Sequence, residues 1–333
     1  MNLERVDQIA KAVLYEGYML YPYRPSSVKN RQRWNFGVVY PKAYSDANGD
    51  SEPCAMRTEC LITGDADTNL ECKLRFLHLR TRSNDPGAQI PAGSLPDGWQ
   101  EAVERDVSVP RVKLGQLCLE SVSHTFSFPS EMRFNAERSV NGQTAAIVRR
   151  QAEIEGTIKV VVEPIREGLY KLSLLVSNNT AIGVFPAHRE EALLQSLVSA
   201  HLILGVEGGD FVSLLEPPDE FQEIASHCQN VGAWPVLVGE PGQRDTLLAS
   251  PIILYDYPQI APESAGDLFD GTEIDEILSL RILTLTDEEK QEIRESDERA
   301  RQILERTESM PAEQFMKLHG AVRGMRPIKE DAS

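Results

Sequence analysis

Three carboxylates follow a short apolar run late in the chain: Asp256, Glu263 and Asp267 come shortly after residues 251–255. Acidic side chains in the loop after a buried strand are common in active sites and in sites for hard cations. If the three converge, they could bind Mg²⁺ or Ca²⁺, or act as general acid and base in a hydrolase or metal-dependent enzyme. The alternative is that Asp270 or Thr272 caps the next helix, the more common role of such a residue, and that the other acids are solvated.

A second candidate site is a group of aromatic and cationic residues near the start of the chain. Six of the nine tyrosines fall in the first 44 residues, and residues 1–42 carry seven Lys/Arg against three Asp/Glu. Tyr, Trp and Arg are enriched at binding hot spots, so the segment predicts a docking surface for another protein. The pattern fits equally well a β-rich lid whose tyrosines pack inside the molecule. The docking hypothesis uses Tyr18, Tyr21, Tyr23, Arg24, Arg31, Arg33 and Trp34.

A glycine-containing loop at residues 239–246 follows an apolar run, as a phosphate-binding loop would. Asp245 stands where such a loop needs lysine, and Arg244 stands in place of the preceding glycine. A carboxylate there repels a phosphate, and without the glycine the tight backbone cradle is lost. The loop therefore predicts a Pro-Gly turn that leads into a strand, and not a nucleotide site.

The cysteines do not have the spacing of a metal site. Zinc and iron–sulfur sites use close C-x2-C pairs, and none is present. We expect no metal and no cofactor, and we interpret His201, which lies in an apolar run, as a core histidine with satisfied hydrogen bonds. The five cysteines are Cys54, Cys60, Cys72, Cys118 and Cys228.

Composition and charge narrow the class of protein. The 333 residues are 41% apolar and 26% charged, as in a typical globular protein long enough for two domains. No run approaches the roughly 20 apolar residues of a membrane-spanning helix, and the first residues lack the apolar core of a secretory signal. A net charge of −17 repels phosphates. We expect a cytoplasmic protein that binds neither nucleic acid nor a membrane.

The first half of the chain predicts mostly strands. Apolar residues at helical spacing predict a helix over residues 3–17, and three prolines make residues 18–44 extended, with strands at 18–23 and 34–40. Alternation of apolar and polar residues predicts further strands, and the Pro- and Gly-rich stretch 83–98 predicts a loop. These strands lie at 58–63, 70–82 and 116–128, and in a hairpin of 156–163 with 169–176.

Helices and strands alternate in the second half. The wide apolar pattern of residues 188–205 predicts a helix, and a second helix is expected over 218–229. Thr286 and Glu289 form a capping box that should open a helix reaching about residue 306. Further strands are expected at 211–215, 234–238 and 251–255, and further helices at 273–280 and from 309–311 to about 320–324.

Several runs together resemble a known family: residues 14–24, 27–34, 201–210, 250–264 and 271–286. On these runs, which span most of the chain, the protein resembles a bacterial family associated with gene clusters of actinobacterial-type nickel–iron hydrogenases. The resemblance supplies no catalytic residue. It implies an accessory role in assembly, maturation or electron-transfer support, with a hydrogenase subunit or a maturation factor as partner. The chain lacks the paired C-x2-C motifs of a hydrogenase subunit itself.

These observations predict an α+β fold with a β-rich, antiparallel sandwich or barrel-like middle, a small α/β layer and a helical C-terminal tail. The first functional hypothesis is a non-catalytic accessory or interaction protein; the second is the hydrolase or metal-dependent enzyme. The sequence makes no prediction of oligomeric state. The expected segments are 1–50 (helix and aromatic, basic segment), 51–185 (β-rich), 186–265 (α/β layer) and 266–333 (acidic helical tail).

Overall fold

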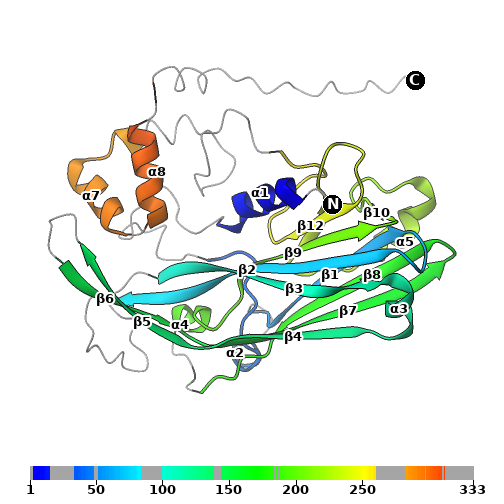
Figure 1. The fold of residues 1–333 in the computed structure, drawn as a ribbon, viewed down its shortest axis with the longest axis horizontal. Coiled ribbons are helices and arrows are strands. Elements are labelled where there is room, and N and C mark those ends of the chain that lie inside the picture. The colour runs from blue at the N-terminus through cyan, green and yellow to red at the C-terminus, as the bar shows by residue number, and fades with distance from the viewer. Residues whose placement is uncertain are drawn as a thin grey trace.

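Two antiparallel sheets pack face to face in the computed structural model (Figure 1). The smaller sheet has five strands, in the order β10 (Asp210–Val212), β1 (Ala55–Thr63), β8 (Leu169–Asn178), β7 (Ile154–Arg166) and β4 (Val122–Phe128). The structure describes residues 3–15, 34–48, 52–83, 100–138, 144–183, 185, 188–259, 282–296, 298–309 and 311.

The larger sheet has seven strands and is built around the long strand β2 (Asn69–Ser83). Strand β3 (Gln100–Lys113) pairs with β2 along one edge, and β9 and β6 pair with successive parts of the other edge. The order from the far edge is β11 (Trp234–Leu237), β12 (Thr246–Ser250), β9 (Val198–Glu207), β2, β6 (Thr144–Gln151) and β5 (Glu131–Arg138).

Alternating side chains place β2 in the sandwich as its sequence predicts. Leu70, Leu74 and Phe76 face the smaller sheet and are buried, while Glu71 and Lys73 face the other side. The hairpin of β7 and β8 is also confirmed, with Gly168 in its turn at a φ of 72°. The α+β class and the β-rich, antiparallel sandwich are therefore confirmed; in the described residues the sheets do not close into a barrel.

The predicted helix over residues 188–205 is wrong. A short helix, α4 (Arg189–Leu193), is followed by the strand β9, in which nine consecutive residues are buried. Leu202 and Leu204 face the smaller sheet, whereas Ile203 packs against α1 (Leu3–Leu14) on the opposite face. Because both faces of β9 are covered, its sequence lacks the alternation of a half-buried strand.

Three other predicted strands differ from the structure. Residues 251–255 form a loop after β12, and residues 34–40 contain only an isolated bridge between Val39 and Leu197. The strand predicted over 116–128 begins later, because α3 (Leu114–Leu119) precedes β4. Cys118 is therefore half-buried on a helix, whereas Cys60 and Cys72 are buried in strands. The predicted turn at 239–246 is confirmed, since it joins β11 to β12.

Helices cover the outer face of the larger sheet (Figure 1). Val6 and Ile9 of α1 pack on β9, β11 and β12, and α7 (Asp287–Ser296) and α8 (Glu298–Glu308) cover Leu77 and Leu79 of β2. The helix predicted from the capping box up to residue 306 is instead two helices packed on each other. Further short helices in the described residues are α2 (Lys42–Asn48), the 3₁₀ turn η3 (Asp219–Phe221) and α5 (Gln222–Ser226), besides α3 and α4.

None of the described helices combines the length and apolar content that crossing a membrane requires. The boundaries proposed at residues 50, 185 and 265 stay a prediction. Strands β9, β11 and β12, from the segment expected to form an α/β layer, hydrogen-bond into the same sheet as β2.

Candidate anion-binding site

Asp256, the described member of the predicted acidic site, holds a loop in place. Its Oδ1 accepts a hydrogen bond from the backbone N–H of Leu237 at 2.8 Å, and its Oδ2 accepts one from the Ser213 hydroxyl at 2.5 Å. The carboxylate thus ties the loop after β12 to β11 and to the segment after β10. Glu263 and Asp267 lie outside the described residues, so convergence of the three acids stays a prediction.

Trp34, the described member of the predicted docking surface, packs inside the molecule. It is 2% exposed and lies in a cluster with Leu14, Tyr40 and Tyr44. Arg189 donates a 2.7 Å hydrogen bond to its backbone carbonyl. The expectation that the Trp34 side chain is exposed is therefore wrong. Tyr18, Tyr21, Tyr23, Arg24, Arg31 and Arg33 lie outside the described residues, and their role in docking stays a prediction.

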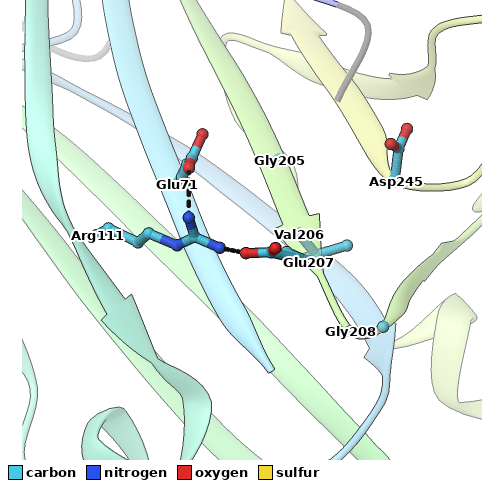
Figure 2. Close-up of a pocket in the computed structure, with 8 residues that line it drawn as sticks. Glu71, Arg111, Gly205, Val206, Glu207, Gly208 and Asp245 are labelled. Atoms are coloured by element: carbon cyan, nitrogen blue, oxygen red, sulfur yellow. Dashed lines mark ion pairs between the residues drawn. The ribbon is translucent and has the colours of Figure 1, made fainter. Parts of the chain in front are cut away.

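A pocket of about 360 Å³ lies on the helix-covered face of the larger sheet (Figure 2). Arg111 forms ion pairs there with Glu71, at 3.5 Å, and with Glu207. Asp245 lines the opposite side of the pocket, so the lining contains three carboxylates and one guanidinium group. This excess of acid disfavours an anion. In the part of the chain that the structure describes, no group of three His, Cys, Asp or Glu side chains could hold a metal ion.

A long hairpin crosses from one sheet to the other at the opposite end of the molecule from α3 and α5 (Figure 1). Strands β4 and β7 pair in the smaller sheet, and their continuations β5 and β6 pair in the larger sheet. Residues 129–130 and 152–153 connect the two parts. Strands that switch sheets in this way form the corner of a sandwich. Beyond this corner, the inner face of the larger sheet carries charged side chains.

The strand register brings five arginines onto this inner face, which we call the arginine face: Arg80, Arg82, Arg105, Arg133 and Arg149. Directly paired residues of neighbouring strands point to the same side of a sheet. Arg105 pairs with Phe76, which faces the core, and this fixes the direction of the whole set. The other pairs are Arg80 with Glu101 and Gln151, Arg82 with Arg149, and Arg149 with Arg133.

Glu101 is the central carboxylate of the arginine face. It accepts a 2.8 Å hydrogen bond from Nε of Arg80 and two from Arg149, at 2.8 and 3.1 Å, and its nearest contact with Arg82 is 3.6 Å. Burial alone would raise the pKa of Glu101, but Arg149 and Arg80 hold it below its usual value. One carboxylate is therefore shared among three guanidinium groups.

Arg105 lies where the arginine face meets the apolar core. Its guanidinium carbon is 4.8 Å from the centre of the Phe128 ring, a cation–π contact. Its Nε is buried and has no hydrogen-bond acceptor among the described residues. Burial lowers the pKa of this guanidinium, with Arg133 and Arg80 acting in the same direction and Glu131 opposing them.

His78 lies beneath the same contact and is fully buried. Its Nδ1 is 2.9 Å from Nε2 of Gln151, whose amide donates, so the ring proton belongs on Nε2. Burial lowers the pKa of His78 to about 4, and Arg105 adds to this effect. The backbone of Ala152 acts in the opposite direction on the pKa of His78. The buried Nε–H of Arg105 therefore remains a donor without an acceptor among the described residues at this boundary.

The arginine face has the chemistry of an anion-binding surface. Among the side chains that the structure describes on this face, five arginines accompany two carboxylates, Glu101 and Glu131, so these seven residues carry a net charge of +3 in a chain whose net charge is −17. Guanidinium groups bind carboxylates and phosphates through paired hydrogen bonds. The Arg133 side chain is 61% exposed, and among the described residues its ion pair is with the neighbouring Glu131, at 2.5 Å, whose side chain is 42% exposed.

Comparison with known proteins does not show a family for this chain. No family model matches the chain, and no curated protein sequence matches it. The link to hydrogenase gene clusters therefore stays a prediction.

The arginine face was missed by the sequence interpretation. Its arginines are spread over residues 80–149, and they meet because β2, β3, β5 and β6 pair with one another. One signal was available: Arg80 and Arg82 continue, at the same two-residue spacing, the series of inward-facing residues that begins at Leu70. That spacing predicts cations on the core side of the strand, which is unusual enough to mark a site.

Proposed function

We propose that this protein is a non-catalytic accessory protein that binds an acidic segment of another protein at the arginine face. The excess of five arginines over two carboxylates among the described side chains of this face, in a strongly acidic chain, carries the proposal. Charge complementarity of this kind steers association and selects the partner. The overall charge of −17 disfavours nucleic acid, because the summed field of the chain repels phosphates.

The partner that we propose is a cytoplasmic hydrogenase subunit or a factor for hydrogenase maturation. This part of the proposal rests on the resemblance of residues 14–24, 27–34, 201–210, 250–264 and 271–286 to the hydrogenase-associated family. The enzyme hypothesis has less support, because both oxygens of Asp256 accept hydrogen bonds that fix a loop.

The test compares two charge reversals of equal size. Arg133→Glu changes an exposed residue of the arginine face, and Arg166→Glu changes an arginine that is 48% exposed at the far end of β7. The tagged wild-type protein is cross-linked in its native host, and its partner is identified by mass spectrometry. The Kd of the purified partner is then measured for the three forms.

We expect Arg133→Glu to weaken binding at least tenfold, because it replaces attraction by repulsion at the contact, and Arg166→Glu to change Kd less than twofold. Equal effects of the two variants would contradict the arginine face as the binding surface. A partner unrelated to hydrogenases would contradict the hydrogenase part of the proposal alone.

A further inference from the structure

Strand β5 forms an open edge of the larger sheet. In the described part of the chain it hydrogen-bonds on one side only, to β6. Its residues 131–135 are all exposed. The backbone N–H and C=O groups on the free side of such an edge can pair with an added strand.

The register of three strands produces a row of arginines that ends at this edge. Arg82 of β2 pairs with Arg149 of β6, and Arg149 pairs with Arg133 of β5. Like charges that lie directly opposite each other on paired strands repel. Glu101 relieves this repulsion at the inner end of the row, through Arg149 and Arg82. At the outer end, Glu131 of the same strand pairs with Arg133. The position opposite Arg133 on an added strand would suit a further carboxylate.

The opposite face of β5 is apolar at the two positions that flank Arg133. Met132 is 52% exposed and Phe134 is 64% exposed. Neighbouring residues of a strand point to opposite faces, so these two side chains lie on the face away from the arginines. A strand that added to β5 would cover both with its own alternate side chains.

We propose that the acidic segment of the partner binds in extended conformation, as an additional strand beside β5. An Asp or Glu of that segment lies opposite Arg133 and continues the row Arg82–Arg149–Arg133. The residues before and after this acid are apolar and pack on Met132 and Phe134. This inference rests on the proposed function, because it specifies how the acidic partner binds the arginine face.

The probe for this inference is a ten-residue peptide of alternating Val and Glu, used with the full-length protein. In a strand, the N–H groups of alternate residues point to opposite edges. One form of the peptide is therefore N-methylated at every Val, and a second form at every Glu. Each form blocks one edge of the peptide and leaves its charge unchanged. Binding is measured by calorimetry, and amide hydrogen exchange is followed in β5, with the edge strand β11 as control.

Strand addition predicts that one methylated peptide binds as well as the unmethylated peptide, whereas the other binds at least tenfold more weakly. It also predicts slower exchange in β5 on binding and no change in β11. The two methylated peptides could bind equally well, with Arg133→Glu weakening the binding of both. That result would overturn strand addition but not the proposed function. Protein that dimerises by itself through β5 would also overturn it. Binding that is insensitive to Arg133→Glu would overturn the proposed function as well.

Discussion

Burial keeps two histidines of the larger sheet neutral. His201 of β9 is fully buried, with Nδ1 2.7 Å from the Ser199 carbonyl and Nε2 3.3 Å from the Ser250 hydroxyl. This bears out its interpretation as a core histidine, although on a strand and not on a helix. Burial lowers the pKa of His201 and of His78 to about 4 in each case. Both side chains therefore link the stability of the sheet to pH.

This link predicts a loss of stability in mild acid. In the unfolded chain a histidine takes up its proton near pH 6.5, whereas in the folded protein His78 and His201 do so only near pH 4. The unfolded state thus binds more protons between these values, and stability falls as pH falls from about 6.5 to 4. When the pH is lowered from 7.5 to 5.0, each histidine should reduce the free energy of unfolding by about 2 kcal/mol. Urea unfolding at the two pH values measures this, and equal stabilities would contradict it.

Glu59 of β1 is a buried carboxylate that fixes the segment after α5. It is 3% exposed, lies 2.7 Å from Nζ of Lys171, and accepts hydrogen bonds from the Gln229 N–H at 2.8 Å and the Ser173 hydroxyl at 3.2 Å. Although burial acts to raise it, the pKa of Glu59 is held below its usual value by Lys171 and the Gln229 N–H.

Removing the Glu59 carboxylate should destabilise the folded protein. Glu59→Ala leaves the Lys171 ammonium and the Gln229 N–H without their acceptor, and we expect a loss of about 3 kcal/mol in the free energy of unfolding. The exposed Glu155 of β7 provides the control, since Glu155→Ala should change stability by less than about 0.5 kcal/mol. Denaturant titration of both variants tests the difference. Equal losses would show that burial and pairing of Glu59 are unimportant.

At the scale of single elements, the start of α7 follows its sequence signal closely. The N–H of Thr286 donates to Oε2 of Glu289 at 2.9 Å, and the N–H of Glu289 donates to the Thr286 hydroxyl at 3.2 Å. This reciprocal pair is the predicted capping box. The end of the helix was not predicted, because it depends on the packing of α8 against α7, where Glu308 pairs with Lys290 and Arg294.

The cap gives a prediction for α7. Thr286→Ala removes the hydroxyl that accepts from Glu289, and it should lower the free energy of unfolding by about 1 kcal/mol. Thr286→Ser keeps the hydroxyl and should be close to wild type. Thermal unfolding of the two variants distinguishes them, and a Thr286→Ala variant as stable as Thr286→Ser would contradict the role of the cap.

Local patterns predicted the elements whose partners are close in sequence. The hairpin of β7 and β8 and the alternation of β2 belong to this class, because turn and period are both visible in the chain. Strand β9 does not, because its buried run has the composition of either a core helix or a core strand. The run forms a strand because its two faces are covered by other parts of the molecule, one by α1 and the other by the smaller sheet.

The candidate site depends on the same long-range information. Arg82, Arg149 and Arg133 form a row only because β6 takes over from β9 beside β2. A change of register by one residue would move each arginine to the other face. Composition predicted a cationic docking surface on an acidic protein, and placed it in the N-terminal segment. The arginine face lies on strands of the β-rich middle. The predicted N-terminal docking residues lie outside the described part of the chain, apart from the buried Trp34, so that surface stays a prediction.

For the whole molecule, charge separation is the dominant feature. The seven described residues of the arginine face carry +3 against −17 for the chain, so the proposed acidic segment would be attracted at this face in spite of the overall charge. Exposed charges interact over roughly 8 Å at physiological salt, which confines the attraction to the face itself. We expect the association rate with the partner to fall about tenfold or more between 0.05 and 0.5 M salt, with a smaller change in dissociation rate. Stopped-flow measurements of both rates at the two salt concentrations test this. A salt effect that lies mainly in the dissociation rate would contradict the prediction.

The central claim is that Arg133 meets a carboxylate of the partner, and a double-mutant cycle tests it most directly. Arg133→Glu is combined with a change of each acidic residue of the bound segment to lysine, and Kd is measured for all pairs. For one of these acids, we predict that the pair with both charges reversed binds at least tenfold more tightly than either pair with a single reversal. Strictly additive losses for every acid would contradict a direct contact at the arginine face.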